Sequence, residues 1–188
     1  MEMILFKNPG IENTEETLRI AIEEMKKSNL ETLVISSTRG YSAEKALEII
    51  PEDVKLIVVT HHYGFKKENE CEFSEELRKR IVEKGYSVLT ATHTLSGIER
   101  TFRKEFGGLY PTEIVAQTLR LFCEGVKVCV EIAVMCADAG LVRTDEWIVT
   151  CAGTSKGLDT ALVIKPSNSN RFFDLKIGKV LCMPSDYA

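Results

Sequence analysis

The chain has 188 residues, of which 44% are hydrophobic and 28% charged, with a formal net charge of −4. This length suits one domain, and the weak acidity argues against a general nucleic-acid-binding protein, which carries a clustered basic excess. No apolar run approaches the ~20 residues of a membrane span, and the first residues lack the pattern of a signal peptide. We therefore expect a single cytoplasmic domain over residues 1–188, with neither a membrane nor a nucleic acid as partner.

The first part of the chain alternates amphipathic helices with short apolar strands. An apolar stripe at helical spacing from Leu18 to Met25 predicts a first helix, and a second begins near Ser42 and ends at Pro51. Residues 32–36 (TLVIS) and 55–60 (KLIVVT) are apolar on both faces. Such strands with helices between them predict a parallel sheet that is covered by helices on each side.

The same alternation continues through the middle of the chain. A helix is predicted over residues 74–84 and a third strand over residues 87–91. Residues 94–106 are predicted to be helical, with their apolar side chains on one side. Pro111 opens a longer helical region that is nearly apolar all round after Gly125, as in a helix buried against a sheet.

The last part of the chain predicts a hairpin. Residues 147–151 (WIVTC) and 159–165 (DTALVIK) are two further strands joined by a short loop. Parallel neighbours need a crossover of a dozen or more residues, so this pair is expected to be antiparallel. Residues 172–175 and 179–183 are predicted as short extended pieces at the sheet edge.

The six cysteines show no Cys-x-x-Cys and no paired spacing. Structural zinc sites need close ligand pairs, so we expect no metal among them. Cys129 and Cys136 lie seven residues apart in a helical stretch and share one face with apolar neighbours. We expect reduced cysteines that pack as small hydrophobic residues.

The first predicted strand ends in a run of polar residues and a glycine that leads into a helix. They are Ser36, Ser37, Thr38, Arg39, Gly40 and Ser42. Hydroxyls, free backbone N–H groups and a helix N-terminus together form an anion site, and Arg39 adds positive charge. The alternative is an ordinary strand-to-helix turn with a serine cap. We expect a phosphate to bind here, although the loop is not a Walker A motif.

A second polar loop follows the fourth predicted strand and carries a cation. It consists of Gly153, Thr154, Ser155, Lys156 and Gly157. Alone it is a weak signal, because a tight hairpin also uses glycines. Ligands of open α/β sheets bind at the carboxyl ends of the strands, so two such loops at one edge favour a ligand site.

All three histidines follow predicted strands: His61 and His62 the second, and His93 the third. A metal site is the weaker reading, because successive strand residues point to opposite faces and no carboxylate stands nearby. We prefer histidines that line a ligand cleft. Aromatic residues in the adjoining loops that could stack on a planar ring are Tyr63, Phe65, Phe106 and Tyr110. Neither a nucleophile elbow nor a dinucleotide fingerprint occurs, and no catalytic residue is assigned.

Two segments resemble the C-terminal, allosteric domain of pyruvate kinase. Residues 33–60 (LVISSTRGYSAEKALEII…KLIVVT) resemble its strand, phosphate loop, helix and second strand. Residues 147–164 (WIVTCAGTSKGLDTALVI) resemble its last two strands and the loop between them. The whole chain is similar to a small archaeal family of stand-alone proteins with this fold, in which THHYGF, GGLYPTEIVAQTLR, GVKVCVEIAVMCADAGL and FFDLK have counterparts.

The resemblance implies a three-layer α/β/α domain with a mixed five-stranded sheet, in the order 3-2-1-4-5, whose fifth strand is antiparallel. The topological switch point then lies between strands one and four, where the two polar loops meet. In pyruvate kinase this crevice binds a sugar bisphosphate, at positions that match Ser37, Thr38, Gly40 and Ser42. Arg39 departs from the small hydroxyl residue usual there, and the loop over residues 153–157 is shorter.

The stand-alone family resembles a binder of flavin mononucleotide (FMN). This likeness implies a phosphate on Ser37–Gly40 and a ring toward the three histidines, and Gly108 is included among the expected contacts. Alternatives that use the same site are a flavin-dependent oxidoreductase and an allosteric module that binds a sugar phosphate. No counterpart of the pyruvate kinase catalytic domain occurs, so kinase activity is not expected. A homo-oligomer is left open.

Overall fold

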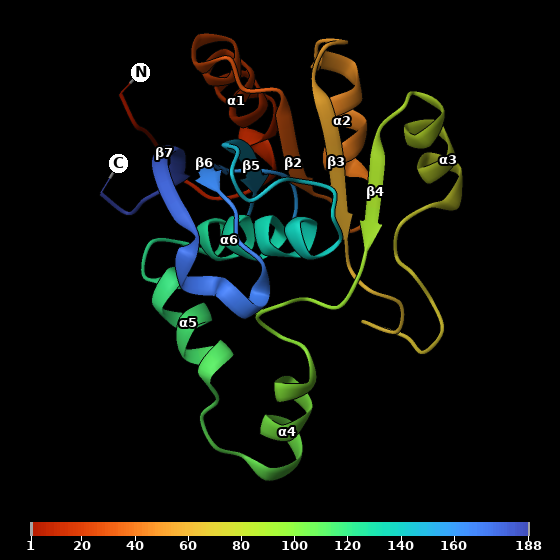
Figure 1. Cartoon of the computed structure of the whole chain (residues 1–188), viewed down its shortest axis with the longest axis vertical. Coiled ribbons are helices and arrows are strands. Elements are labelled where there is room, and N and C mark those ends of the chain that lie inside the picture. Colours follow the sequence, from red (N-terminus) through yellow and green to blue (C-terminus); the bar gives the residue numbers. More distant parts are fainter. Residues whose placement is uncertain (1, 188) are drawn as a thin grey trace.

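The computed structural model describes residues 2–187, which form one seven-stranded sheet in the order β1-β7-β6-β5-β2-β3-β4 (Figure 1). The strands are β1 (Ile4–Phe6), β2 (Thr32–Ser36), β3 (Lys55–Thr60), β4 (Ser87–Thr90), β5 (Ile148–Ala152), β6 (Thr160–Lys165) and β7 (Lys176–Pro184). The α-helices are α1 (Thr14–Ser28), α2 (Tyr41–Ile49), α3 (Glu75–Glu83), α4 (Ile98–Phe106), α5 (Pro111–Arg120) and α6 (Glu124–Asp138).

The five predicted strands are β2 to β6, and they lie in the predicted order. β2, β3, β4 and β5 are parallel, whereas β6 pairs with β5 antiparallel, with Val149 opposite Val163. The class and the order are therefore confirmed. Helices cover both faces of the sheet: α1, α2 and α3 pack on one, and α6 packs on the other.

The sheet has two more strands than the five expected. β7 adds antiparallel to β6, and β1 adds parallel to β7. Residues 179–183 are therefore part of a nine-residue strand, and the prediction of an extended piece at residues 172–175 was wrong, because a 3-10 turn over Ser169–Asp174 occupies that position. Register shifts between β6 and β7 interrupt the period of two that would have shown the full length of β7 in the sequence.

The predicted long helical region is two helices, because the chain breaks between Arg120 and Glu124. α6 then approaches β6 so closely that a Cβ on Gly125 would lie 2.0 Å from Thr160 Oγ1. Only glycine fits this position without a shift of one of the two elements. The buried character predicted for this helix is confirmed, since most of its residues are buried.

The helix predicted over residues 94–106 begins only at Ile98 and projects from the body of the domain (Figure 1). We call residues 98–120, which include α4, α5 and the turn between them, the arm. No residue of α4 is buried, and Ile98 and Phe106 are 76% and 78% exposed. The apolar side chains Ile98, Phe102 and Phe106 of this helix are therefore exposed.

The prediction that the cysteines pack as small hydrophobic residues is confirmed for four of the six. All six are free, and Cys129, Cys136, Cys151 and Cys182 are fully buried. Burial raises the pKa of Cys136 and of Cys182 to about 12, which keeps these thiols protonated and unreactive. Within residues 2–187, no helix is both long and apolar enough to cross a membrane.

Candidate ligand-binding cleft

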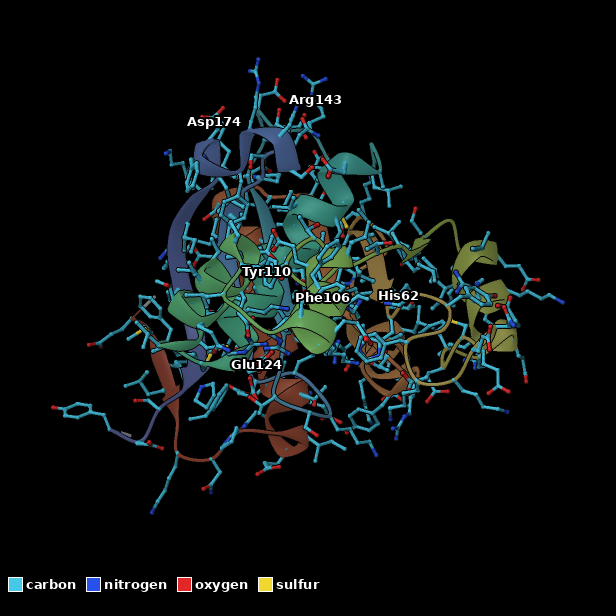
Figure 2. All side chains as sticks on the ribbon, turned by 90° about the horizontal axis from the view of Figure 1, so that it is seen from below. His62, Phe106, Tyr110, Glu124, Arg143 and Asp174 are labelled. Atoms are coloured by element: carbon cyan, nitrogen blue, oxygen red, sulfur yellow. The ribbon has the colours of Figure 1, made fainter. Side chains whose placement is uncertain are left out.

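A cleft of about 1010 Å³ lies at the carboxyl edge of the parallel strands. Its walls come from the ends of β2 and β3, the start of α2, the β5–β6 loop, α6 and the arm. In Figure 1 this edge faces downward, with the arm below it, and Figure 2 looks at the same edge from below. The fold therefore brings the two polar loops and the arm around one space.

The loop after β2 leads directly into the N-terminus of α2, and both line the cleft. Ser37 Oγ accepts a hydrogen bond from the Ala43 amide at 3.2 Å, which fixes the loop against the helix. Gly40 has a φ of +103°, and a Cβ there would lie 2.5 Å from Leu77 Cδ2, so glycine is needed. The first amides of a helix lack intrahelical partners, so this end of α2 offers N–H donors and a positive dipole to an anion.

Glu72 contacts three other side chains that line the cleft. Its carboxylate accepts from His61 Nδ1 at 2.9 Å and pairs with Arg39 at 3.4 Å and Lys66 at 3.3 Å. Burial acts to raise the pKa of Glu72, but these three hydrogen bonds outweigh it and lower the pKa. The Arg39 side chain is 68% exposed and already paired. It therefore offers a phosphate less than the sequence indicated.

The β5–β6 loop places a second cation beside α2. Lys156 Nζ lies 5.1 Å from the centroid of the Tyr41 ring, with no carboxylate within 4 Å among residues 2–187. Asp159 holds this loop in position, because its Oδ2 accepts hydrogen bonds from the amides of Thr154 and Gly10 at 3.0 Å each. Lys156 is thus a free cation on a held loop, next to the helix N-terminus.

His61, Phe65 and His93 form an imidazole and aromatic wall of the same cleft. The His61 and Phe65 rings have centroids 3.8 Å apart, and His93 lies 5.2 Å from His61. Thr38 Oγ1 lies 3.3 Å from His61 Nε2, which connects the wall to the loop after β2. A flat ring could stack along this wall while an anion sits at α2.

An ion pair on α6 also lines the cleft. Lys127 and Glu131 are 5% and 3% exposed, with Nζ and Oε2 2.5 Å apart. Glu131 Oε1 also accepts from the Leu95 amide at 3.0 Å. This pair fixes the turn between β4 and α4, and hence the base of the arm.

A family comparison identifies the domain type. The model for the pyruvate kinase alpha/beta domain matches residues 15–164. The chain belongs to this family. The predicted resemblance to the C-terminal domain of pyruvate kinase is thereby confirmed.

One solved structure that resembles this pyruvate kinase alpha/beta-domain protein is Cryptosporidium parvum pyruvate kinase in complex with ADP. The two chains are 13% identical, and the match covers 89% of this chain with a TM-score of 0.37. The chain spans only 23% of the length of that enzyme.

Most of the predicted site residues of this alpha/beta domain line one cleft. They are Ser36, Ser37, Thr38, Arg39, Ser42, His61, His93, Gly153, Ser155, Lys156 and Gly157. Gly40 supports the loop without lining the cleft, and Thr154 turns its amide toward Asp159. His62 lies at the rim, where Nδ1 is 2.6 Å from the Tyr63 carbonyl oxygen (Figure 2). Gly108 lies in the turn of the arm, outside the lining.

Sequence reasoning missed the charged residues on the arm and on α6. These cleft residues are Glu99, Arg100, Arg103, Glu113, Arg120, Glu124, Lys127 and Glu131. On α4 and α5 they resemble the solvated charges of any surface helix, so nothing local distinguishes them. Lys127 and Glu131 did carry a signal, because an i, i+4 ion pair inside an otherwise apolar helix is rarely buried without a purpose.

The partly buried position of His93 predicts that stability depends on pH. Burial lowers the pKa of His93 to about 4, whereas an imidazole in an unfolded chain titrates near pH ~6.5. Between these values the unfolded chain binds a proton that the native state does not, so stability falls as the pH falls through this window. We expect His93→Gln to reduce the loss of unfolding free energy between neutral pH and about 4, as measured by urea titration at each pH.

His62→Gln is the matched control, because His62 is a neighbouring histidine outside the lining. This variant should lose stability in acid as the natural chain does. A His93→Gln protein with an unchanged acid profile would show that another group titrates.

Proposed function

We propose that this protein binds a phosphorylated ligand with a planar ring, FMN, at the carboxyl ends of β2 and β5. The observation that carries the proposal is the junction of an α2 N-terminus with the free cation Lys156, beside the wall of His61, Phe65 and His93. One anion site next to one aromatic wall matches a ligand with one phosphate and one flat ring.

The position of the cleft supports the same proposal. β2 lies between β3 and β5, so the strand order reverses beside it, and ligands of open α/β sheets bind at such a switch point. The cleft volume of about 1010 Å³ is sufficient, since ligand sites commonly occupy roughly 300–1,000 Å³.

FMN and riboflavin, which share the ring and differ in the phosphate, provide the test. The quenching of flavin fluorescence gives a Kd for each with the natural chain. We expect FMN to bind more tightly than riboflavin, and Lys156→Ala to weaken FMN binding by about tenfold while riboflavin binding changes little.

Arg39→Ala serves as the comparison variant, since Arg39 is already paired with Glu72 and should contribute less than Lys156. Equal affinity for FMN and riboflavin would contradict the placement of the phosphate. A protein that binds neither flavin but binds a sugar bisphosphate would contradict the proposal itself.

A further inference from the structure

Seven lysine and arginine side chains line the cleft, and five of them lie within 4 Å of a carboxylate. Glu72 pairs with Arg39 and Lys66, Glu113 with Arg103, Glu124 with Arg120, and Glu131 with Lys127. Among residues 2–187, the two without a carboxylate within 4 Å are Lys156 and Arg100. Lys156 belongs to the proposed phosphate site at the N-terminus of α2, which leaves Arg100 without an assigned partner.

The guanidinium of the exposed residue Arg100 lies over an aromatic ring. Its guanidinium carbon lies 5.2 Å from the centroid of the Phe65 ring, and Phe65 in turn stacks on His61. Stacking orients the planar guanidinium but uses none of its five N–H donors. Such a group is pre-organised to bind a carboxylate or a phosphate through two parallel hydrogen bonds.

The position of Arg100 in α4 points to a ligand and not to helix stability. Arg100 lies in the first turn of the helix, where the positive end of the dipole disfavours a cation. The same dipole favours an anion bound beside Arg100. Arg103, one turn later, faces the same cleft but is neutralised by Glu113.

We propose that Arg100 binds the oxyanion of a second small molecule, a carboxylate or a phosphate, that lies in the cleft next to the phosphorylated ligand. This inference rests on the proposed function, which uses the corner of α2 and Lys156 for the first phosphate. The volume of about 1010 Å³ lies at the upper end of the range of about 300–1,000 Å³ for sites that hold one small ligand. The two free cations of the cleft, Lys156 and Arg100, would then each bind one anion.

Three probes that share a benzene ring test the proposal: benzoate, phenyl phosphate and the neutral benzamide. Each is titrated calorimetrically into the FMN-loaded protein in a buffer without small oxyanions. We expect at least one anion to bind and benzamide not to bind. Arg100→Gln should weaken anion binding about tenfold to hundredfold, since a charge-assisted bidentate contact is lost. Arg100→Lys should restore only part of the affinity, because lysine lacks the planar fork.

Lys104→Gln is the matched control. It removes the same charge from the same helix, at a residue that does not line the cleft. Anion binding by this variant should equal that of the natural chain, and FMN affinity should change less than twofold in every variant. The relative affinities of benzoate and phenyl phosphate then assign the second ligand to the carboxylates or the phosphates.

Three results would overturn the proposal: no anion binds to the natural chain, Arg100→Gln binds anions as the natural chain does, or Arg100→Gln weakens FMN itself about tenfold. The last result would place the phosphate of FMN on the arm. If the natural chain binds no FMN, the proposed function fails. The anion titrations are then made on the ligand-free protein and still decide the role of Arg100.

Discussion

Replacement of Glu131 by leucine should lower the free energy of unfolding by about 3–5 kcal/mol, because it leaves Lys127 buried without its partner. Both side chains are almost fully enclosed, and Glu131 also binds the Leu95 amide. The double variant Lys127→Met/Glu131→Leu should recover part of the loss, since apolar residues of similar size fill the same space while the Leu95 amide still lacks its acceptor. Urea unfolding of the natural chain, both single variants and the double variant forms the complete cycle.

Arg120 and Glu124 provide the control pair, because they have the same i, i+4 spacing but are about one third exposed. Glu124→Leu should cost no more than about 1 kcal/mol. A Glu131→Leu protein that loses as little, or a double variant no more stable than the single one, would show that the buried pair is not held as the structure indicates.

Glu131→Leu should also affect the ligand-binding cleft, because Glu131 accepts a hydrogen bond from the Leu95 amide. Glu131 fixes the turn that joins β4 to α4, and His93 lies at the start of that turn. Loss of the carboxylate therefore loosens the base of the arm that carries Arg100. If the double variant recovers stability but binds anions weakly, the ion pair has two separate effects, one on the free energy of unfolding and one on the position of the arm.

The sheet was predictable wherever burial has a local pattern. Residues 32–36 and 55–60 are apolar on both faces because helices cover both, which is the signature of parallel strands. The short loop between β5 and β6 left no room for a crossover, and this fixed the antiparallel pair. β1 was not predicted because it pairs with β7 across nearly the whole chain, with Ile4 opposite Cys182, whereas residues 179–183 of β7 were predicted as an extended piece.

The same distinction between local patterns and long-range contacts applies to the candidate site. The loops after β2 and β5 were found because polar residues and glycines directly follow buried strands. Arg100 was not predicted as a site residue, because the sequence around an arginine on an exposed amphipathic helix does not distinguish it from a solvated surface charge. Its role depends on where the arm lies relative to Phe65, and that position is a property of the folded chain.

The buried carboxylate of Asp159 should affect both stability and binding. It is fully buried at the start of the β6 segment, and it accepts three hydrogen bonds: from the amides of Gly10 and Thr154, and from the Thr160 hydroxyl. Asp159→Ala leaves these three donors without an acceptor. An unsatisfied buried group costs about 1–3 kcal/mol, and the part-buried amides of Gly10 and Thr154 cost less, so the unfolding free energy should fall by roughly 3 kcal/mol.

Binding should suffer because the Thr154 amide belongs to the loop that carries Lys156. Without its anchor this loop loses its fixed position, and the free cation is no longer pre-organised beside the N-terminus of α2. We expect Asp159→Ala to weaken FMN binding by about tenfold and riboflavin binding by much less, since only the phosphate contact depends on the loop. Fluorescence titration with both flavins, below the melting temperature of the variant, measures the difference.

Asp159→Asn distinguishes this anchoring role from the effect of a buried charge. The asparagine oxygen can accept from both amides, while its NH₂ group donates to the Thr160 hydroxyl, which can act as an acceptor. The geometry is then kept and only the charge is removed. FMN affinity close to that of the natural chain in Asp159→Asn, with a tenfold loss in Asp159→Ala, would assign the effect to the position of the loop. Equal losses in both variants would instead mean that the negative charge itself matters, and the anchoring argument would fail.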